Sequence, residues 1–588
     1  MEESRKNALS EHIKELFCKR QGIKTLSELN DIIVKSRNNA FRVDKIKDIS
    51  QFILANKSRH FAIIGDYDVD GIMSVLILMR LFLYFGLDVD FDISFRFSEG
   101  FGINQRLIDN ISVPNSIIIT CDNGIAAIDV VKYAKEKGHT VIVTDHHLPV
   151  KDENNHIVLP DADYIFDANA IEGSSEFTKY CGAGNCYKLA QEMLSDDILN
   201  KNATAIALLN ELQTYAAYAT ICDVMELTGE NYAIVYDGFR KMKYSQYATV
   251  GIFALLQSLE LDKYCDAKRI GFNLGPCINA VSRLEDGGSK KLVQMFLNDK
   301  DWNNGRKDAA YVIARNEDRK AYTRKFTAEA KKQVENSCAM YDCPIVLNLP
   351  GCPEGIIGII AGKVSEKYST PAIITTNAEP VDGRNILKGS GRAPEGYDLK
   401  GHLDMVPKRT MFKYGGHEGA AGLSIYEDEF LDFVSSIQST SNDYNFVAST
   451  TVPEIEIDAS EVKDVAEILS TYIWGHGCES PTFLIKNVSI LPTADGYYKV
   501  LGDNTLIKLR LNNGIEAISF NCIDDIMAQV NVQSPKKANL IGTIGYNYFN
   551  GSLVPQIEFT SFHLLEEKTE KSKLASLLQK RCDERIHL

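Results

Sequence analysis

The chain has 588 residues, of which 45% are hydrophobic, 24% charged and 9% aromatic, and this globular composition excludes a disordered, collagen-like or coiled-coil protein. At ~150 residues per domain the length predicts about four domains. The formal net charge of −15 disfavours a protein that only coats nucleic acid, because phosphate binding needs local cations.

Nothing in the sequence predicts a membrane or secreted protein. The longest apolar run, residues 72–87, is interrupted by Ser74 and Arg80 and falls short of the ~18 residues of a membrane span. The first residues are charged, with no apolar segment like that of a secretory signal. The 13 cysteines contain no Cys-x-x-Cys pair and are odd in number, which favours buried reduced thiols. We therefore expect a soluble, cytoplasmic protein.

The first half of the chain reads as helices followed by an α/β domain. Apolar residues at helical spacing predict short helices over residues 1–55. Within residues 56–240, three apolar runs at 61–65, 116–120 and 140–144 alternate with helical segments. Strand, helix and strand at this spacing predict a parallel, doubly wound sheet. Polar residues follow these runs, at the carboxyl ends of the strands where such sheets bind ligands.

Residues 241–338 are predicted to form a helical connector between lobes. Its segment 306–332 carries nine Lys or Arg and four Asp or Glu, so its local charge is 9 − 4 = +5 within an acidic protein. A solvated helix face and a nucleic-acid contact both agree with this excess. Residues 339–445 predict a second α/β domain, with strands at 345–349 and 372–375 and a glycine-rich tract that ends at Gly422.

The last part of the chain is predicted to be a small β-barrel. Residues 446–565 contain short alternating segments such as 506–511 and 517–520, with turn residues at Asn512-Asn513-Gly514. The charged tail, residues 566–588, is expected to be helical.

The clearest chemical signal is Asp66-Tyr-Asp68-Val-Asp70-Gly71, which places three carboxylates between a buried strand and a buried helix. A calcium-binding EF-hand loop begins in the same way, but its twelfth position would be Ile77 instead of Glu, and a strand precedes the motif. A solvated acidic turn does not account for acids at a buried position. Unpaired acids would repel one another there, so the motif indicates a bound cation.

Further candidate ligands follow the neighbouring strands. Asp122 ends one strand, Asp145-His146-His147 ends the next, and Asp223 lies on an apolar helix where an unpartnered acid is costly. Mixed carboxylate and imidazole ligands favour Mn²⁺ or Mg²⁺ over structural zinc. The ligands exceed the needs of one ion, and two ions that share a carboxylate serve phosphoester chemistry.

These motifs, in this order, resemble the four motifs of the DHH phosphoesterase superfamily. Further stretches resemble its RecJ family, and the similarity is collinear from about residue 22 to about residue 565. These stretches are Arg96-Phe-Ser-Glu-Gly-Phe-Gly102, Cys181-Gly-Ala-Gly184, residues 270–284, Gly389-Ser390-Gly-Arg392, Gly415-Gly-His417-Glu-Gly-Ala-Ala-Gly422 and Gly477-Cys-Glu-Ser-Pro-Thr-Phe483.

The resemblance implies the architecture and the activity. The expected fold is an α/β DHH parallel-sheet domain joined by a long helix to a DHH-associated α/β domain, with a C-terminal OB-fold-like barrel. The expected function is a Mn²⁺- or Mg²⁺-dependent exonuclease that degrades single-stranded DNA from 5′ to 3′ into mononucleotides in repair and recombination. A helicase or a single-strand-binding protein is a candidate partner, and a monomer is expected.

The resemblance also assigns residues. Asp68 and Asp70 would each hold one ion, Asp122 would bridge the ions, and His146 and Asp223 would complete the second site. Asp66 would complete the first site or orient water, and His147 would face the scissile phosphate. The implied substrate-binding residues are Arg96, Asn279, Arg283, Ser390, Arg392 and His417. In the barrel, bases would stack on some of Tyr497, Tyr498, Phe520, Tyr546 and Tyr548, beside Lys499, Lys508 and Arg510.

The chain departs from the family pattern at two places. Cys352-Pro353 stands where Trp-His is usual, and Gly-Pro-Cys277 stands where Gly-Pro-Arg is usual. Neither departure touches the metal ligands. Two other functions stay open: a DHH phosphodiesterase acting on oligoribonucleotides, cyclic dinucleotides or pyrophosphate, and a nucleic-acid-binding scaffold without activity. Small substrates need neither the barrel nor the basic connector, and every presumed ligand is present.

Overall fold

The computed structural model describes residues 3–170, 173–298, 300–337, 339–440, 452–492, 496–502, 506–520, 522–523, 526–527, 536–549 and 551–565. Two compact units can be distinguished. Residues 21–440 and 475–478 form one, and residues 3–20, 452–474 and the described residues after 478 form the other. None of the described helices is both long enough and apolar enough to span a membrane.

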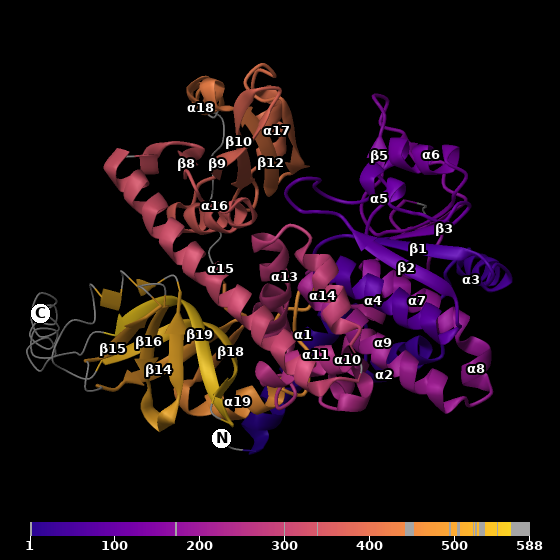
Figure 1. Ribbon diagram of the computed structural model, residues 1–588. Coiled ribbons are helices and arrows are strands. Elements are labelled where there is room, and N and C mark those ends of the chain that lie inside the picture. The colour runs from indigo at the N-terminus through magenta and orange to yellow at the C-terminus, as the bar shows by residue number, and fades with distance from the viewer. Residues whose placement is uncertain are drawn as a thin grey trace, which may run out of the picture. The chain divides into compact units, whose positions relative to one another are not determined.

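The first unit contains the predicted parallel sheet, in the strand order β2-β1-β3-β4-β7 with every neighbouring pair parallel (Figure 1). Its strands are β1 (His60–Gly65), β2 (Asp88–Ile93), β3 (Ile117–Cys121), β4 (Thr140–Thr144) and β7 (Tyr164–Phe166). The central strands are continuous apolar runs because helices cover both faces of the sheet. The doubly wound α/β prediction is confirmed.

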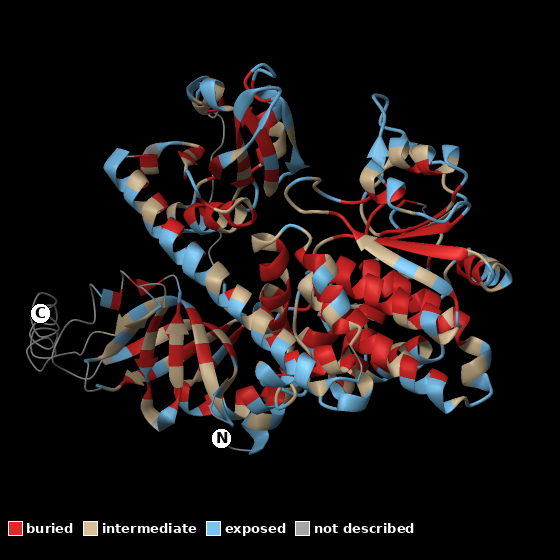
Figure 2. Ribbon diagram, in the orientation of Figure 1, coloured by how far each residue is buried: buried red, intermediate tan, exposed pale blue. Residues whose placement is uncertain are grey.

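The helix that follows β1, α4 (Val69–Tyr84), is buried along most of its length and packs on α7 (Gly182–Met193) and α9 (Ala203–Cys222) (Figure 2). The remaining elements of this part of the chain are α2 (Leu26–Arg37), α3 (Ile46–Ala55), α5 (Gln105–Asp109), α6 (Ile128–Glu136), β5 (Val150–Lys151), β6 (Ile157–Val158), α8 (Ser195–Leu199), α10 (Gly229–Lys241), η1 (Ser245–Tyr247), α11 (Val250–Ser258), α12 (Ala267–Arg269), the π-helix η2 (Ile270–Leu274), α13 (Gly275–Leu284) and α14 (Gly288–Phe296).

A long helix, α15 (Trp302–Ser337), connects the two α/β parts of this unit. It packs on α11 and α13 and then on α16 (Glu354–Tyr368) (Figure 1). The second sheet has the order β11-β12-β10-β9-β8, in which β8 and β9 are parallel and the other pairs antiparallel. Its elements are η3 (Ala339–Tyr341), β8 (Ile345–Asn348), β9 (Ala372–Val381), β10 (Arg384–Arg392), α17 (Leu399–Met405), β11 (Lys413–His417), β12 (Ala420–Tyr426), η4 (Glu427–Glu429) and α18 (Phe430–Ser439).

The second unit is the predicted barrel. Its sheet has the order β13-β14-β18-β19-β17-β16-β15, and a bridge between Ile490 and Leu511 links the end of β14 to the end of β16. Its elements are β13 (Ile455–Asp458), η5 (Ala459–Glu461), α19 (Val462–Leu469), β14 (Phe483–Ile490), β15 (Tyr498–Leu501), β16 (Leu506–Arg510), η6 (Asn512–Gly514), β17 (Glu516–Ser519), β18 (Lys536–Phe549) and β19 (Ser552–Leu565).

The helices expected within residues 1–55 divide between the units. Leu9 and Ile13 of α1 (Glu3–Gln21) join the core of the barrel, whereas α2 and α3 belong to the unit with the parallel sheet. Helical periodicity indicates that a segment is a helix, but it does not indicate which core its apolar face covers. The helix expected over residues 566–588 lies outside the described residues.

Candidate metal centre and phosphate cavity

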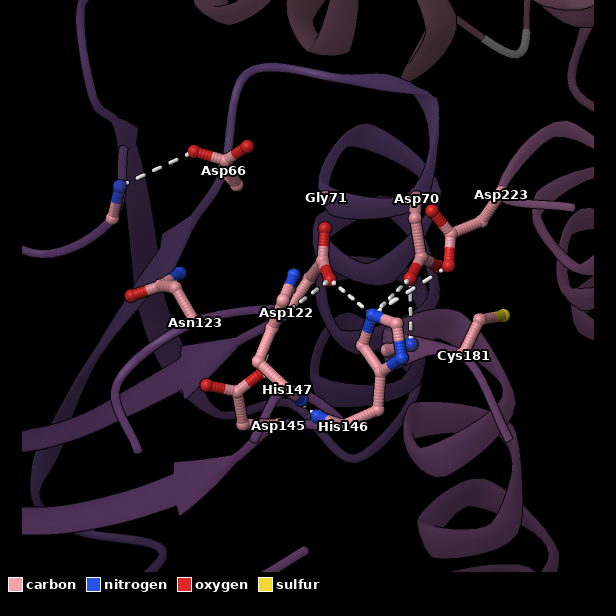
Figure 3. Close-up of polar contacts among 12 residues, drawn as sticks. Asp66, Asp70, Gly71, Asp122, Asn123, Asp145, His146, His147, Cys181 and Asp223 are labelled. Carbon is pink, nitrogen blue, oxygen red and sulfur yellow. Dashed lines mark hydrogen bonds and ion pairs between the residues drawn. The ribbon is translucent and has the colours of Figure 1, made fainter. Parts of the chain in front are cut away.

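The acidic residues singled out in the sequence lie at one edge of the parallel sheet. Asp66 follows β1, Asp122 follows β3, and Asp145 and His146 follow β4. Asp68 is the N-cap of α4, where its Oδ1 accepts the backbone N–H groups of Asp70, at 2.9 Å, and Gly71, at 3.2 Å. Because parallel strands present their carboxyl ends at the same edge, side chains that are distant in sequence meet here (Figure 3).

The ring of His146 lies at the centre of this group. Its Nε2 is 3.1 Å from Oδ1 of Asp122, 3.5 Å from Oδ2 of Asp70 and 3.6 Å from Oδ2 of Asp223 (Figure 3). A second group joins Asp122 to Asp66 and Asp68, with one oxygen of each within 4.8 Å of the others. Asp122 is thus common to both groups.

The electrostatics of the group call for a cation. Burial, and then the charge of Asp68, raises the pKa of Asp66 to about 8. Burial, and then Asp70, raises the pKa of Asp223 to about 9, and the same two causes raise that of Asp122 well above its usual range. Each carboxylate is therefore costly to ionise unless a positive charge joins it.

The residues present fit divalent metal ions. Oδ1 of Asp122 and Nε2 of His146 are buried, and neither makes a hydrogen bond within the described part of the chain. Burial lowers the pKa of His146, so its ring is neutral at pH 7 and has a lone pair for a metal. Carboxylate oxygens with one imidazole form the donor set that suits Mn²⁺ or Mg²⁺.

The backbone around the centre is closely packed. Both oxygens of Asp70 accept N–H groups from the first turn of α7, those of Gly182 at 2.6 Å and Ala183 at 2.8 Å. A Cβ at Gly182 would lie 2.6 Å from that of Asp122, which accounts for the glycine in the Cys181-Gly-Ala-Gly184 motif. Asp122 itself has a φ of 62°, an uncommon left-handed conformation of the kind that clusters at functional sites.

Asp145 positions His147 and lies outside both groups of candidate ligands. Its Oδ1 accepts a hydrogen bond from Nδ1 of His147 at 2.8 Å, and its Oδ2 accepts the N–H of Ile125 at 2.9 Å. Burial lowers the pKa of His147, but the hydrogen bond and charge of Asp145 outweigh it and raise the pKa to about 9. His147 is therefore a cation at neutral pH in the metal-free protein, and one of its ring nitrogens lies within 4.8 Å of candidate ligand atoms of Asp122 and His146.

A cavity of about 440 Å³ lies between the two α/β parts of this unit. It is lined by four of the predicted substrate-binding residues, which are Arg96, Arg283, Ser390 and Arg392. Arg392 donates from Nη1 to Oγ of Ser390 at 3.1 Å, and Arg96 stacks over the ring of Tyr67, 4.5 Å from its centroid.

The cavity has an excess of positive charge. In the described structure, Arg96, Arg283 and Arg392 form no ion pair with a carboxylate. Burial lowers the pKa of Arg283 to about 9, and the charge of Arg96 contributes further. Burial, and then Arg96, also lowers the pKa of Arg392. Converging guanidinium groups without counter-ions are suited to an anion such as phosphate.

Two predicted residues lie elsewhere. His417 is exposed at the end of β11 and is absent from the cavity lining; its Nδ1 accepts the N–H of Gly419 at 3.3 Å. Asn279 lies one turn before Arg283 on α13, also outside the lining, and its buried Oδ1 has no hydrogen-bond partner among the described residues.

Sequence analysis did not identify Tyr67, Lys388 or Lys413, which also line the cavity. One signal was available for Lys388. Alternate residues of a strand share a face, so Lys388 lies on the same face of β10 as Ser390 and Arg392. Lys413 is brought to the cavity by the packing of β11 and β12 on β10, for which the sequence carries no local signal.

Burial distinguishes some of the barrel aromatic residues that pack in the core from those that are accessible to solvent. Tyr497, Tyr498 and Tyr546 pack against the core of the barrel, whereas the side chain of Phe520 is 52% exposed. Lys508 pairs with Glu516. Phe520 is therefore the most accessible of these rings for a stacked base.

Three family descriptions match the chain in succession. Residues 60–219 match the DHH family, N-terminal domain, residues 344–442 match the DHHA1 domain, and residues 454–561 match the RecJ OB domain.

Curated relatives support the same assignment. The single-stranded-DNA-specific exonuclease RecJ of Bacillus subtilis is 27% identical over 536 residues, which cover 88% of this chain and 64% of the relative, so the chain spans less than two thirds of that protein. The RecJ of Haemophilus influenzae is also 27% identical, over 93% of this chain and 95% of the relative.

The fold agrees with that of a solved structure. The crystal structure of RecJ in complex with Mn²⁺ from Thermus thermophilus matches with a TM-score of 0.69 and 22% identity, over 89% of this chain and 72% of that one. The chain therefore contains, in this order, a DHH N-terminal domain, a DHHA1 domain and a RecJ OB domain, and it is similar along most of its length to proteins named RecJ.

Proposed function

We propose that this protein is a Mn²⁺- or Mg²⁺-dependent exonuclease that hydrolyses single-stranded DNA from its 5′ end and releases mononucleotides. One observation carries the proposal: the carboxylate cluster around His146 and a cavity lined by arginines without counter-ions belong to the same compact unit. The similar proteins of Bacillus subtilis and Haemophilus influenzae are named single-stranded-DNA-specific exonucleases, which supports the proposed substrate. A role in DNA repair and recombination belongs to the same proposal.

The metal ligands are Asp68, Asp70, Asp122, His146 and Asp223. Asp122 would be shared by two ion sites, which agrees with its place both in the group with His146 and in the group with Asp66 and Asp68, and Asp66 would complete the first site or orient water. The ions supply positive charge that lowers the pKa of water and offsets the charge developing on the phosphate. The chain contributes the placement of the ligands, whose orientation depends on the α7 amides and on the backbone of Asp122.

His147 acts on the scissile phosphate. Because Asp145 accepts the Nδ1 hydrogen bond, Nε2 of the protonated ring is the group free to donate to a phosphate oxygen. A charged donor at this place stabilises the negative charge of the transition state. Asn279 and Arg283 hold the sugar-phosphate backbone nearby, where the side-chain NH2 group of Asn279 and the guanidinium of Arg283 can donate to phosphate oxygens.

The cavity sets the polarity of degradation. Metal-assisted hydrolysis would act on any phosphodiester presented in line, so direction depends on recognition of the chain end. Arg96, Ser390 and Arg392 offer charge-assisted donors to a 5′-terminal phosphate. His417, which lies outside the lining, contacts the strand at the edge of this site. The barrel adds affinity for the strand through stacking, with Phe520 the first candidate.

The wider setting belongs to the same proposal. The protein acts as a monomer in the cytoplasm, and a helicase or single-strand-binding protein supplies the strand.

The decisive experiment uses single strands labelled at the 5′ or 3′ end, as DNA and as RNA, with Mn²⁺ or with a chelator. Mononucleotides released first from the 5′ end of DNA, in Mn²⁺ only, are expected. Cleavage of short RNA or small nucleotides alone would favour another DHH phosphodiesterase, and binding without cleavage would favour a scaffold. Release of the 3′ label first would refute the polarity.

Arg392→Ala tests the cavity. Loss of one charged hydrogen-bonding group costs about 1.5–3 kcal/mol, or roughly 10- to 150-fold in kcat/KM on 5′-phosphorylated strands, with a much smaller effect on 5′-hydroxyl strands. Arg384→Ala is the matched control, since Arg384 lies on the same strand but pairs with Asp428 at 2.6 Å and is outside the cavity lining. Equal effects of both variants would exclude the cavity as the 5′-phosphate site.

A further inference from the structure

Two buried side chains orient an arginine on α15. Cys277 and Asn316 are 1% and 5% exposed, and Nδ2 of Asn316 donates to Sγ of Cys277 at 3.1 Å. Oδ1 of Asn316 accepts the Nε hydrogen bond of Arg319 at 3.0 Å. The packing of α13 on α15 therefore fixes the plane and direction of the Arg319 guanidinium.

Arg319 is held in place without a counter-ion. Among the described residues, Asn316 is the only hydrogen-bond partner of its side chain, and the guanidinium forms no ion pair. Arg315, one turn earlier on the same helix, has two acidic partners, Asp318 at 2.6 Å and Glu285 at 3.5 Å. Partial burial of a charged guanidinium with no balancing charge has a desolvation cost that reduces the stability of the folded protein. A bound anion offsets this cost.

The position of Arg319 places that anion outside the cavity. Arg319 is close enough to Arg283 for its charge to lower the pKa of Arg283, after burial and the charge of Arg96, but it does not line the cavity. The first turn of α13 also packs beside the metal ligands, because a Cβ at Gly275 would lie 2.9 Å from Sγ of Cys222, the residue before Asp223. Arg319 thus lies near Arg283 and, through Asn316, beside Cys277 in the first turn of α13.

We propose that Arg319 binds an internal phosphodiester of the DNA strand, distinct from the terminal phosphate, with Asn316 and Cys277 as positioning residues. This inference rests on the proposed single-strand substrate. It also gives a physical meaning to one departure from the family pattern. Where the pattern has arginine on α13, this chain has Cys277, and the thiol leaves room for a guanidinium that comes instead from α15.

The test compares Arg319→Gln with Arg315→Gln in the full-length protein. Binding of a long 5′-hydroxyl single strand is measured by fluorescence anisotropy between about 50 and 200 mM salt, with chelator to prevent cleavage. One lost phosphate contact is expected to reduce the slope of log affinity against log salt by about 0.7 for Arg319→Gln. Arg315→Gln is expected to leave the slope unchanged, because its acidic partners already balance its charge.

Asn316→Asp gives an independent test that keeps the guanidinium. A carboxylate in place of the Asn316 amide forms an ion pair with Arg319, so the slope is expected to fall as it does in Arg319→Gln. With Mn²⁺, both variants are expected to lower kcat/KM several-fold on a long strand and to leave kcat/KM on a dinucleotide unchanged. The ratio of kcat/KM on 5′-phosphorylated strands to kcat/KM on 5′-hydroxyl strands is expected to stay at its wild-type value.

An unchanged slope in both Arg319→Gln and Asn316→Asp would overturn the inference, as would an equal loss in Arg315→Gln. A change in the ratio of kcat/KM between 5′-phosphorylated and 5′-hydroxyl strands would assign Arg319 to the terminal-phosphate site and would also overturn the inference. If wild-type protein fails to cleave DNA, the proposed function fails, yet the binding slopes still decide whether Arg319 contacts a phosphate.

Discussion

The affinity for Mn²⁺ should depend steeply on pH, because the ligands hold protons when no metal is bound. Asp66 and Asp223, with pKa values of about 8 and 9, are protonated at pH 7 in the metal-free protein, and both must ionise to bind a cation. His146 is already neutral and releases nothing. Asp66 and Asp223, which each release one proton, give a slope of at least two in log apparent affinity against pH, or at least a hundredfold per pH unit, and Asp122, whose pKa is also raised well above its usual range, adds to this slope.

Isothermal titration with Mn²⁺ between about pH 6 and 7.5, in buffers of different ionisation enthalpy, measures both the affinity and the protons released. Asp223→Asn should reduce the slope by about one. Asp167→Asn is the control, since burial and then Asp145 raise the pKa of Asp167 to about 7 although it lies outside the ligand groups, and its removal should leave the slope unchanged. A slope near zero in the wild type would show that the carboxyls are ionised without metal and would refute the reasoning.

Three further outcomes are expected. Asp122→Ala should abolish cleavage and retain single-strand binding, because loss of the shared ligand disrupts both ion sites; activity above about a hundredth of wild type in Mn²⁺ would contradict the bridging role. Gly358→Ala should reduce the preference for 5′-phosphorylated strands, because its Cβ would lie 2.9 Å from Nη2 of Arg392; a wild-type ratio of rates on the two strands would refute this. Since the folded-state pKa of Asp167 is raised to about 7, its contribution to wild-type stability is lost as pH rises from about 4, where an Asp ionises in the unfolded chain, to about 7; Asp167→Asn should therefore raise Tm most above pH 7 and least below about pH 4, and an equal Tm difference at both would argue against a raised pKa.

The metal centre was predictable because its signals are local in sequence. Asp66, Asp122 and Asp145 each follow an apolar run, and the parallel arrangement of three such runs brings their ends to one edge of a sheet. The predicted metal ligands do lie together in the structure. The role of Asp145 could not be predicted in the same way, since only the geometry of the turn distinguishes a ligand from the acid that orients His147.

The cavity was predictable only in part. Arg96 and Arg392 were identified through the family resemblance, but they lie 296 residues apart (392 − 96) and meet only because α15 and α16 bring the second sheet beside the first. Lys413 enters the lining and His417, four residues later on the same strand, does not. Which residues of a strand face a neighbouring domain depends on register and docking, which no local pattern carries.

The sequence by itself determined the α/β class, the parallel sheet, the barrel and the residues proposed as metal ligands, because periodicity and strand-end chemistry are encoded within a few residues. Only the tertiary structure decided that α1 completes the barrel core, that the arginines of the cavity converge without an ion pair to any described carboxylate, and that Asn316 orients Arg319 beside Cys277. The reason is physical: these features arise from packing between segments distant along the chain, where burial and the absence of a partner charge depend on three-dimensional neighbours.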